Sequence, residues 1–244
     1  MKLSQKEKAA LKAAFRSMTP GEKAEYILTY YKWPILLGLL ALAVLCSGVY
    51  RRLTEKEPVL YVGFVNTVVG EDLKTGLTSG YLSDSGLDLR RKEVYTYEDL
   101  YLTDDADTLS HEYAYASRMK VLGAVNAGKL DVVFTNREGY DLLSRAGYLL
   151  DLGELLREND PQSAQRLEPL LTENAVVISD NSLEVLLNEA EAADTVTENA
   201  RNGLPLSGFP LFREAGFDGE VYLTVIANSS RRDSVTSYIR YLCG

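Results

Sequence analysis

Residues 33–50 form a run of eighteen residues, WPILLGLLALAVLCSGVY, that contains no charged side chain. Lys32 stands directly before the run, and Arg51 and Arg52 stand directly after it. At about 1.5 Å of rise per residue, a helix of this length reaches roughly 27 Å, close to the thickness of the hydrocarbon core of a bilayer. The sequence therefore predicts a single transmembrane helix over residues 33–50.

Basic residues set the predicted orientation of this helix. Seven Lys and Arg side chains precede the run, whereas only Arg51, Arg52 and Lys56 follow it closely. Because cytoplasmic flanks carry the excess of positive charge, we expect residues 1–32 in the cytoplasm and the C-terminal part outside the cell membrane. Aromatic side chains that suit the two membrane interfaces border the run: Tyr26, Tyr30, Tyr31, Trp33 and Tyr50.

Two other targeting signals could contain the same apolar run. A cleaved signal peptide is the main alternative, but more than thirty residues precede the run and no small-x-small cleavage site is evident. A lipoprotein signal would use Cys46, yet Leu45 occupies the preceding position, where such signals carry a small residue. We therefore expect an uncleaved, single-pass anchor in the cell membrane.

The charge balance changes at the same place in the chain. Residues 1–52 carry a net charge of +6, so the formal total of −9 leaves −15 for residues 53–244. An acidic domain without a basic stripe repels nucleic acid, which argues against a nucleic-acid partner. Because its only thiol is Cys243, the domain has no internal disulfide and its core must stabilise it unaided.

The sequence predicts four segments: an amphipathic cytoplasmic segment over residues 1–32, the transmembrane helix over 33–50, a polar linker over 51–58 and one extracytoplasmic domain over 59–244. In the domain, apolar runs typical of buried strands occupy 60–66, 130–135, 175–179 and 221–228, and an alternation of rings and polar residues predicts a further strand over 93–102. Helices are predicted over 71–82, 140–146, 153–157, 182–193 and 232–242, and from a cap at Asp107 or Thr108 to a stop near Gly128. This alternation predicts a layered α/β domain with a mostly parallel sheet flanked by helices.

Two further segments each combine a strand with a helix. Residues 127–152, AGKLDVVFTNREGYDLLSRAGYLLDL, place a small-Gly-Lys turn before a strand and a helix before a closing Gly and "DL". Residues 220–242, EVYLTVIANSSRRDSVTSYIRYL, carry a strand into a helix that ends in "YIRYL". Both segments resemble type II extracellular solute-binding proteins, and the resemblance covers roughly 50 residues and rests on pattern alone. It implies a solute-binding-protein-like lobe.

The resemblance also implies where a ligand would bind. In open α/β sheets, ligands bind beyond the carboxyl ends of the strands, close to helix N-termini. The positions that the sequence offers there, with rings that could stack on a sugar, are Asn66, Tyr95, Tyr97, Thr135, Asn136, Ser207, Gly208 and Phe209. Each could equally be a loop cap or a core ring.

Residues 123–129, GAVNAGK, match the spacing of a nucleotide-binding loop. Leu130 follows them, where a Ser or Thr must hold magnesium, and the glycines come after a predicted helix and before a strand, the reverse of the required order. The segment is therefore interpreted as a helix stop.

Catalytic and metal-binding patterns have little support in this sequence. Asp104, Asp105 and Asp107 lack the central Gly and the further ligands of a calcium loop. His111 is the only histidine and has no cysteine near it, which excludes a zinc cluster. We expect no enzyme activity, no metal and no cofactor.

The sequence thus predicts a membrane-anchored, non-catalytic extracytoplasmic domain that resembles solute-binding proteins. Such a domain would present a small solute or a protein partner at the cell envelope, in association with a transporter. Because the domain is short for a two-lobed binder, the alternative is a structural or assembly protein whose domain lacks a pocket and makes protein contacts.

Overall fold

A computed structural model of the chain describes residues 18–103, 111–178, 196–213, 217 and 219–244. The chain divides into two compact units, Met1–Glu55 and Lys56–Gly244. The described part of the first unit contains helices α2 (Pro20–Tyr30) and α3 (Lys32–Thr54), and α3 includes the uncharged run. Among the described residues, none of the helices combines the length and the apolar content that a bilayer crossing requires.

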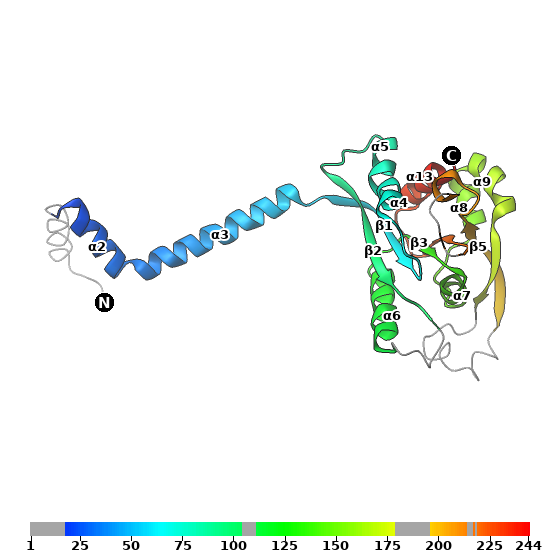
Figure 1. Ribbon diagram of the computed structural model, residues 1–244, viewed down its shortest axis with the longest axis horizontal. Helices are drawn as coiled ribbons and strands as arrows, with labels where there is room; N and C mark the ends of the chain where they lie inside the picture. The colour runs from blue at the N-terminus through cyan, green and yellow to red at the C-terminus, as the bar shows by residue number, and fades with distance from the viewer. Residues whose placement is uncertain (1–17, 104–110, 179–195, 214–216, 218) are drawn as a thin grey trace. The chain divides into compact units, whose positions relative to one another are not determined.

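The second unit is an α/β fold built on a six-stranded sheet (Figure 1). The strands are β1 (Glu57–Val65), β2 (Lys92–Leu100), β3 (Val132–Thr135), β4 (Thr172–Val177), β5 (Thr197–Pro205) and β6 (Tyr222–Val225). The helices are α4 (Glu71–Thr75), the π-helical turn η1 (Gly76–Gly80), α5 (Tyr81–Asp84), α6 (His111–Asn126), α7 (Arg137–Arg145), α8 (Leu152–Asn159), α9 (Pro161–Leu167), the 3-10 turn η2 (Glu168–Leu170), α12 (Pro210–Arg213) and α13 (Arg232–Cys243). The prediction of a layered α/β domain is confirmed.

The sheet is mixed, so the prediction of a mostly parallel sheet is wrong. In the strand order β2-β1-β3-β6-β5-β4, β1 is parallel to both β2 and β3. The other three pairings are antiparallel. The error arises from β5, whose sequence TENARNGLP contains Gly and Pro and few apolar residues. Because β5 lies between β4 and β6 and is antiparallel to both, these strands need no helical crossover.

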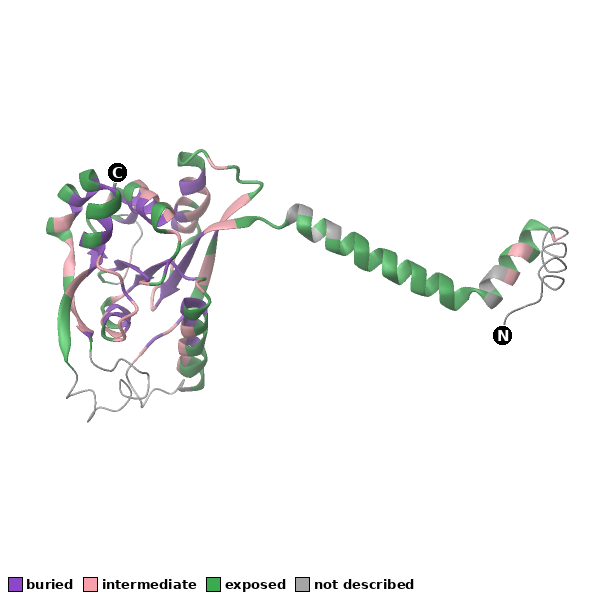
Figure 2. Cartoon of the chain, turned by 180° about the vertical axis from the view of Figure 1, so that it is seen from behind, coloured by how far each residue is buried: buried purple, intermediate pink, exposed green. Residues whose placement is uncertain are grey.

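Helices cover both faces of the sheet. The chain from α4 to α5, together with α8, α9, α12 and α13, packs on one face around Phe64 and Phe134. Helices α6 and α7 pack on the other face around Val65 and Val133. Figure 2 shows the buried residues concentrated on the strands and on the inner sides of these helices.

Most predicted elements are present, with ends that differ by a few residues. The helix predicted over 71–82 is interrupted by the π-helical turn η1, and the segment 123–129 does end a helix, because Gly128 adopts a φ of +61° just after α6. The sequence analysis missed α9, β5 and α12. The helix predicted over 182–193 and the caps at Asp107 and Thr108 lie outside the described residues.

A buried carboxylate joins the central strands. Asp131, which has no exposed surface, precedes β3 and accepts hydrogen bonds from the backbone N–H of Tyr61 at 2.9 Å and the hydroxyl of Ser229 at 2.6 Å. Arg231 donates to the same carboxylate at 3.2 Å while its guanidinium lies 4.6 Å from the ring centre of Tyr61. The backbone N–H of Asp131 donates to Tyr61, and its C=O accepts from Ile226. One residue thus connects β1, β3 and the end of β6.

A second polar network attaches α7 to β5. The Tyr140 hydroxyl donates to the Asn202 side chain at 2.7 Å, and the Asn202 amide donates to Ser144 at 2.8 Å. All three side chains are buried. Gly203 faces the Tyr140 ring so closely that a Cβ there would lie 2.5 Å from it.

We expect Gly203→Ala to destabilise the domain by about 2 kcal/mol, because the added methyl group must displace a ring that packing and hydrogen bonds hold in place. Urea unfolding of residues 56–244, a compact unit of their own, measures this. Gly208→Ala is the matched control, because nothing lies within 4 Å of a Cβ at that position. Equal stabilities of the two variants would contradict the packing described here.

A pH-dependent contribution is expected from Asp160, the N-cap of α9. Hydrogen bonds from Ser163, and secondly from Arg240 of α13, hold the pKa of this carboxyl below its usual value. The stabilisation is therefore present above the unfolded pKa of about 3.9 and is lost as the pH falls through the lower folded pKa. Asp160→Asn keeps the cap but loses the charge, so it should cost about 1 kcal/mol at pH 7 and nothing below the folded pKa. Urea unfolding across pH 2.5–7 tests this, and a pH-independent difference would contradict it.

Candidate functional site

The four strands β1, β2, β3 and β5 end at the same edge of the sheet, where the sequence predicts a ligand site. Val65 at the end of β1 pairs with Thr135 at the end of β3, and Thr135 pairs with Tyr222 of β6. Pro205 at the end of β5 pairs with Tyr222 from the other side. The residues that follow β1, β3 and β5 therefore lie along one edge.

Asn66 continues the pairing of β1 with β2. Its side-chain amide donates to the C=O of Leu102 at 2.6 Å, and its Oδ1 accepts from the N–H of Leu102 at 2.8 Å. The backbone of Asn66 has a φ of +53°, a conformation that asparagine tolerates better than most residues. Both ends of the amide are thus used within the chain, in the role of a loop cap.

Thr135 and Asn136 support the start of α7. Asn136 is its N-cap, because its side chain accepts a hydrogen bond from the N–H of Gly139 at 3.0 Å. Thr135 is fully buried, and its hydroxyl lies against Gly139, where a Cβ would come within 2.2 Å of Oγ1. Within the described part of the chain, this hydroxyl has no hydrogen-bond partner.

The loop after β5 carries Ser207, Gly208 and Phe209. Ser207 and Gly208 are exposed, and the C=O of Gly208 accepts a hydrogen bond from Arg213 at 3.2 Å. Phe209 packs partly against the core, and its N–H closes a turn with the C=O of Leu206. Of the three, Ser207 has the side chain that is both polar and exposed at this edge.

Tyr95 and Tyr97 lie elsewhere, along β2 rather than at its end. They pair with Tyr61 and Gly63 of β1, and the three tyrosine rings form a cluster with centroid distances of 5.0 to 6.5 Å. Tyr95 is 44% exposed, whereas burial raises the pKa of Tyr97. The structure therefore separates these rings from the strand-end residues.

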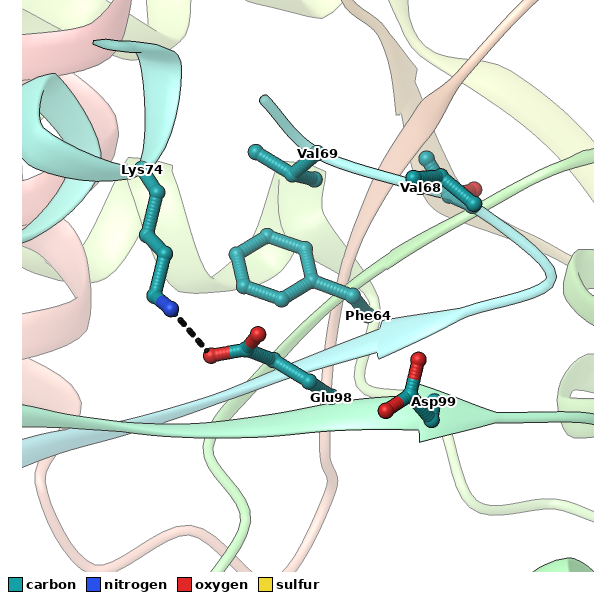
Figure 3. A pocket seen from close by; sticks show the side chains of 7 residues that line it. Phe64, Val68, Val69, Lys74, Glu98 and Asp99 are labelled. Carbon is teal, nitrogen blue, oxygen red and sulfur yellow. Dashed lines mark ion pairs between the residues drawn. The ribbon is translucent and has the colours of Figure 1, made fainter. Parts of the chain in front are cut away.

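A small cavity lies between the loop after β1 and the end of β2 (Figure 3). Its volume is about 50 Å³, and it is lined by Phe64, Thr67, Val68, Val69, Lys74, Glu98 and Asp99. This volume holds one or two water molecules, whereas pockets for small ligands measure about 300–1,000 Å³. The sequence analysis named none of the seven lining residues.

Lys74 and Glu98 form an ion pair in the lining of this cavity. Figure 3 shows the two side chains pointing toward one another, with 2.6 Å between Lys74 Nζ and Glu98 Oε1. The hydrogen bond from Lys74 lowers the pKa of Glu98, and the bond to Glu98 raises the pKa of Lys74. Both groups are therefore charged at neutral pH.

The end of β2 is irregular next to this cavity. β2 has one extra residue relative to β1 between Tyr97 and Leu100, and Asp99 adopts a φ of +55° in this bulge. The one signal in the sequence is the Glu-Asp pair, which breaks the alternation of rings and polar residues. Among the described residues, no group of three His, Cys, Asp or Glu side chains is arranged to hold a metal ion.

Replacing Asn66 separates a structural role from a ligand role. Asn66→Ala should lower the free energy of unfolding by about 2–3 kcal/mol, because it removes two hydrogen bonds and disfavours the positive φ. Asn66→Gly should cost about 1 kcal/mol less, because it keeps the backbone conformation. Urea unfolding of residues 56–244 measures both. Stabilities equal to that of the unmodified protein would contradict the structural role.

Comparisons with known proteins assign the chain to no group. No protein-family model, no curated protein and no solved structure matches it. The resemblance to solute-binding proteins therefore stays a prediction from the sequence, and the function is argued below from the residues themselves.

Proposed function

We propose that the chain is a single-pass membrane protein whose C-terminal α/β domain is non-catalytic and binds other proteins at the cell envelope. The observation that carries this proposal is the apolar surface of α3. The side chains of this helix that are large, apolar and exposed are Trp33, Ile35, Leu36, Leu37, Leu39, Leu40, Leu42, Val44, Leu45 and Tyr50. A helix that is apolar on all sides is typical of a membrane or of a protein interior.

The length of the apolar run supports the same proposal. Among the residues whose side chains the structure describes, the unbroken uncharged run extends from Trp33 to Gly48. These sixteen residues are fewer than the roughly twenty that a helix needs to cross a bilayer. Val49, whose side chain is not described, and Tyr50 extend the run to eighteen in the sequence, within a helix of 23 residues. The excess of basic residues before the run supports a cytoplasmic N-terminus.

The strand-end residues favour protein contacts over capture of a solute. The amide of Asn66 bonds to Leu102, and the side chain of Asn136 caps α7, so these polar groups already have partners within the chain. The neighbouring cavity, at about 50 Å³, is too small for a sugar or an amino acid. The alternative from the sequence, a protein-interaction domain, therefore has more support than the solute-binding one.

Labelling of single cysteines in intact cells tests the anchor and its orientation. In a Cys46→Ser background, Val68→Cys should react with a membrane-impermeant maleimide, because Val68 is 91% exposed in the domain proposed to be outside. Gly21→Cys, at an exposed position before α3, should react only after the membrane is opened. The background itself should stay unlabelled, because Cys243 is buried and burial raises its pKa to about 12.

Two results would contradict the proposal. Recovery of the full chain in the soluble fraction, or labelling of Gly21→Cys alone, would rule out the anchor or its orientation. A sugar, amino acid or peptide that raises the Tm of the full chain by several degrees at saturation would instead favour solute binding, because a ligand at 100 times its Kd stabilises the native state by about 2.7 kcal/mol.

A further inference from the structure

Strand β2 is the last strand on its side of the sheet. It pairs with β1, and no strand of the described residues pairs with its other side. The strand is nine residues long, and in Figure 1 it forms the outer border of the sheet. A free edge of this length exposes unpaired backbone N–H and C=O groups, which another strand can bind.

The backbone groups that face outward can be identified from one hydrogen bond. The C=O of Arg91 accepts from the N–H of Glu57, so Arg91 faces β1. Because successive residues of a strand alternate in direction, Glu93, Tyr95 and Tyr97 also face β1. The N–H and C=O groups of Val94 and Thr96 then face the free side. At the two ends of the strand, the N–H of Lys92 already donates to the C=O of Asp88 at 2.8 Å, and Glu98 adjoins the bulge between Tyr97 and Leu100.

The side chains of β2 are self-complementary about Tyr95. Lys92 and Glu98 carry opposite charges and stand three residues before and three residues after Tyr95. If a second copy of β2 pairs antiparallel about Tyr95, Lys92 lies opposite Glu98 of the second copy, and Val94 lies opposite Thr96 of the second copy. Val94 and Thr96 are outward-facing, as the hydrogen-bonded positions of an antiparallel pair must be. They supply the backbone bonds of the contact, and the side chains of Lys92 and Glu98 supply the opposite charges at its two ends.

Existing ion pairs hold these charges on one face of the sheet. Lys92 Nζ lies 2.6 Å from Glu57 Oε2, and Glu98 Oε1 lies 2.6 Å from Lys74 Nζ. In the paired copies, four charges of alternating sign would lie in a row. They belong to Glu57 and Lys92 of one copy, followed by Glu98 and Lys74 of the second copy. Exposed ion pairs contribute little individually, but a row of them selects one register over another.

The ring of Tyr95 supplies an apolar contact at the centre. It is 44% exposed and rests on Tyr61 and Tyr97, with centroid distances of 5.7 and 5.0 Å. Residues that face away from the partner strand form the non-hydrogen-bonded positions, where opposite Cα atoms are only about 4.5 Å apart. The two Tyr95 side chains would therefore meet on the same face, where aromatic cross-strand pairs stabilise a sheet.

We propose that two copies of this chain associate through antiparallel pairing of β2 with β2, centred on Tyr95, so that their two sheets become one continuous sheet. This contact is isologous, as a two-fold dimer requires. It goes beyond the proposed function, and it does not depend on whether α3 spans a membrane.

Disulfide formation in the full chain tests the contact. Tyr95→Cys in a Cys46→Ser background should form a covalent dimer on mild oxidation, because the proposed Cα separation lies in the range of disulfides. Tyr115→Cys, at a more exposed position on α6, is the matched control and should remain monomeric. Equal crosslinking of both variants, or none with Tyr95→Cys, would overturn the proposal. A product that contains a different protein would overturn it too, because it would show another occupant of this edge.

Charge exchange tests the register. In the Tyr95→Cys background, Lys92→Glu and Glu98→Lys should each reduce the initial rate of crosslinking by about tenfold, because each places like charges opposite one another at two symmetric sites. The double variant should recover the rate. Within one chain, the double variant places a Glu side chain beside Glu57 and a Lys side chain beside Lys74, so both intrachain contacts join like charges. Intrachain ion pairs therefore cannot explain a recovery of the crosslinking rate. A double variant that is slower than both single variants would overturn the register, and near-UV circular dichroism confirms that all variants are folded.

Discussion

The buried carboxylate of Asp131 is the interaction on which the centre of the domain depends. It accepts hydrogen bonds from Tyr61, Ser229 and Arg231, and its own backbone groups bond to β1 and to the end of β6. A buried charge is costly unless its lone pairs are satisfied, so these partners must be in place together. That requirement fixes the register of β1, β3 and β6, and with it the edge where their ends lie.

Hydrogen bonds from tyrosine hydroxyl groups likewise hold both helical layers in place. On one face, Tyr238 and Tyr241 of α13 donate hydrogen bonds to the carbonyl groups of Leu77 and Gly76 in the π-helical turn η1. These bonds satisfy carbonyl groups in a turn whose hydrogen-bond pattern departs from that of the α-helix. On the other face, Tyr140 reaches Asn202 and so attaches α7 to β5. Polar groups close to the sheet are thus used to hold layers together, and the side chains of Asn66 and Asn136 at the strand ends are used within the chain in the same way.

The sequence predicted strands and helices well where the apolar pattern was strong. The run LDVVFT corresponds to β3, and its continuous apolar pattern matches a strand buried on both faces. The segment that ends at Leu242 corresponds to α13, and its pattern matches a helix buried on one face. The sequence analysis missed β5 because the position of TENARNGLP in the sheet depends on contacts with neighbouring elements. Gly203 fits beneath Tyr140, and Leu204 enters the core beside Leu223. At the site, the sequence placed Asn66 and Asn136 at the strand ends but could not show that their side chains already had partners.

The sequence by itself determined the alternating elements, the uncharged run of residues 33–50 and the acidic charge of the domain, because each is a property of neighbouring residues along the chain. The tertiary structure decided the direction of β4, β5 and β6, the pairing of Lys74 with Glu98 and the place of β2 at the end of the sheet that the described strands form. These features join residues that are far apart in the sequence. They follow from which strand lies beside which, and that depends on packing and on buried hydrogen bonds rather than on local pattern.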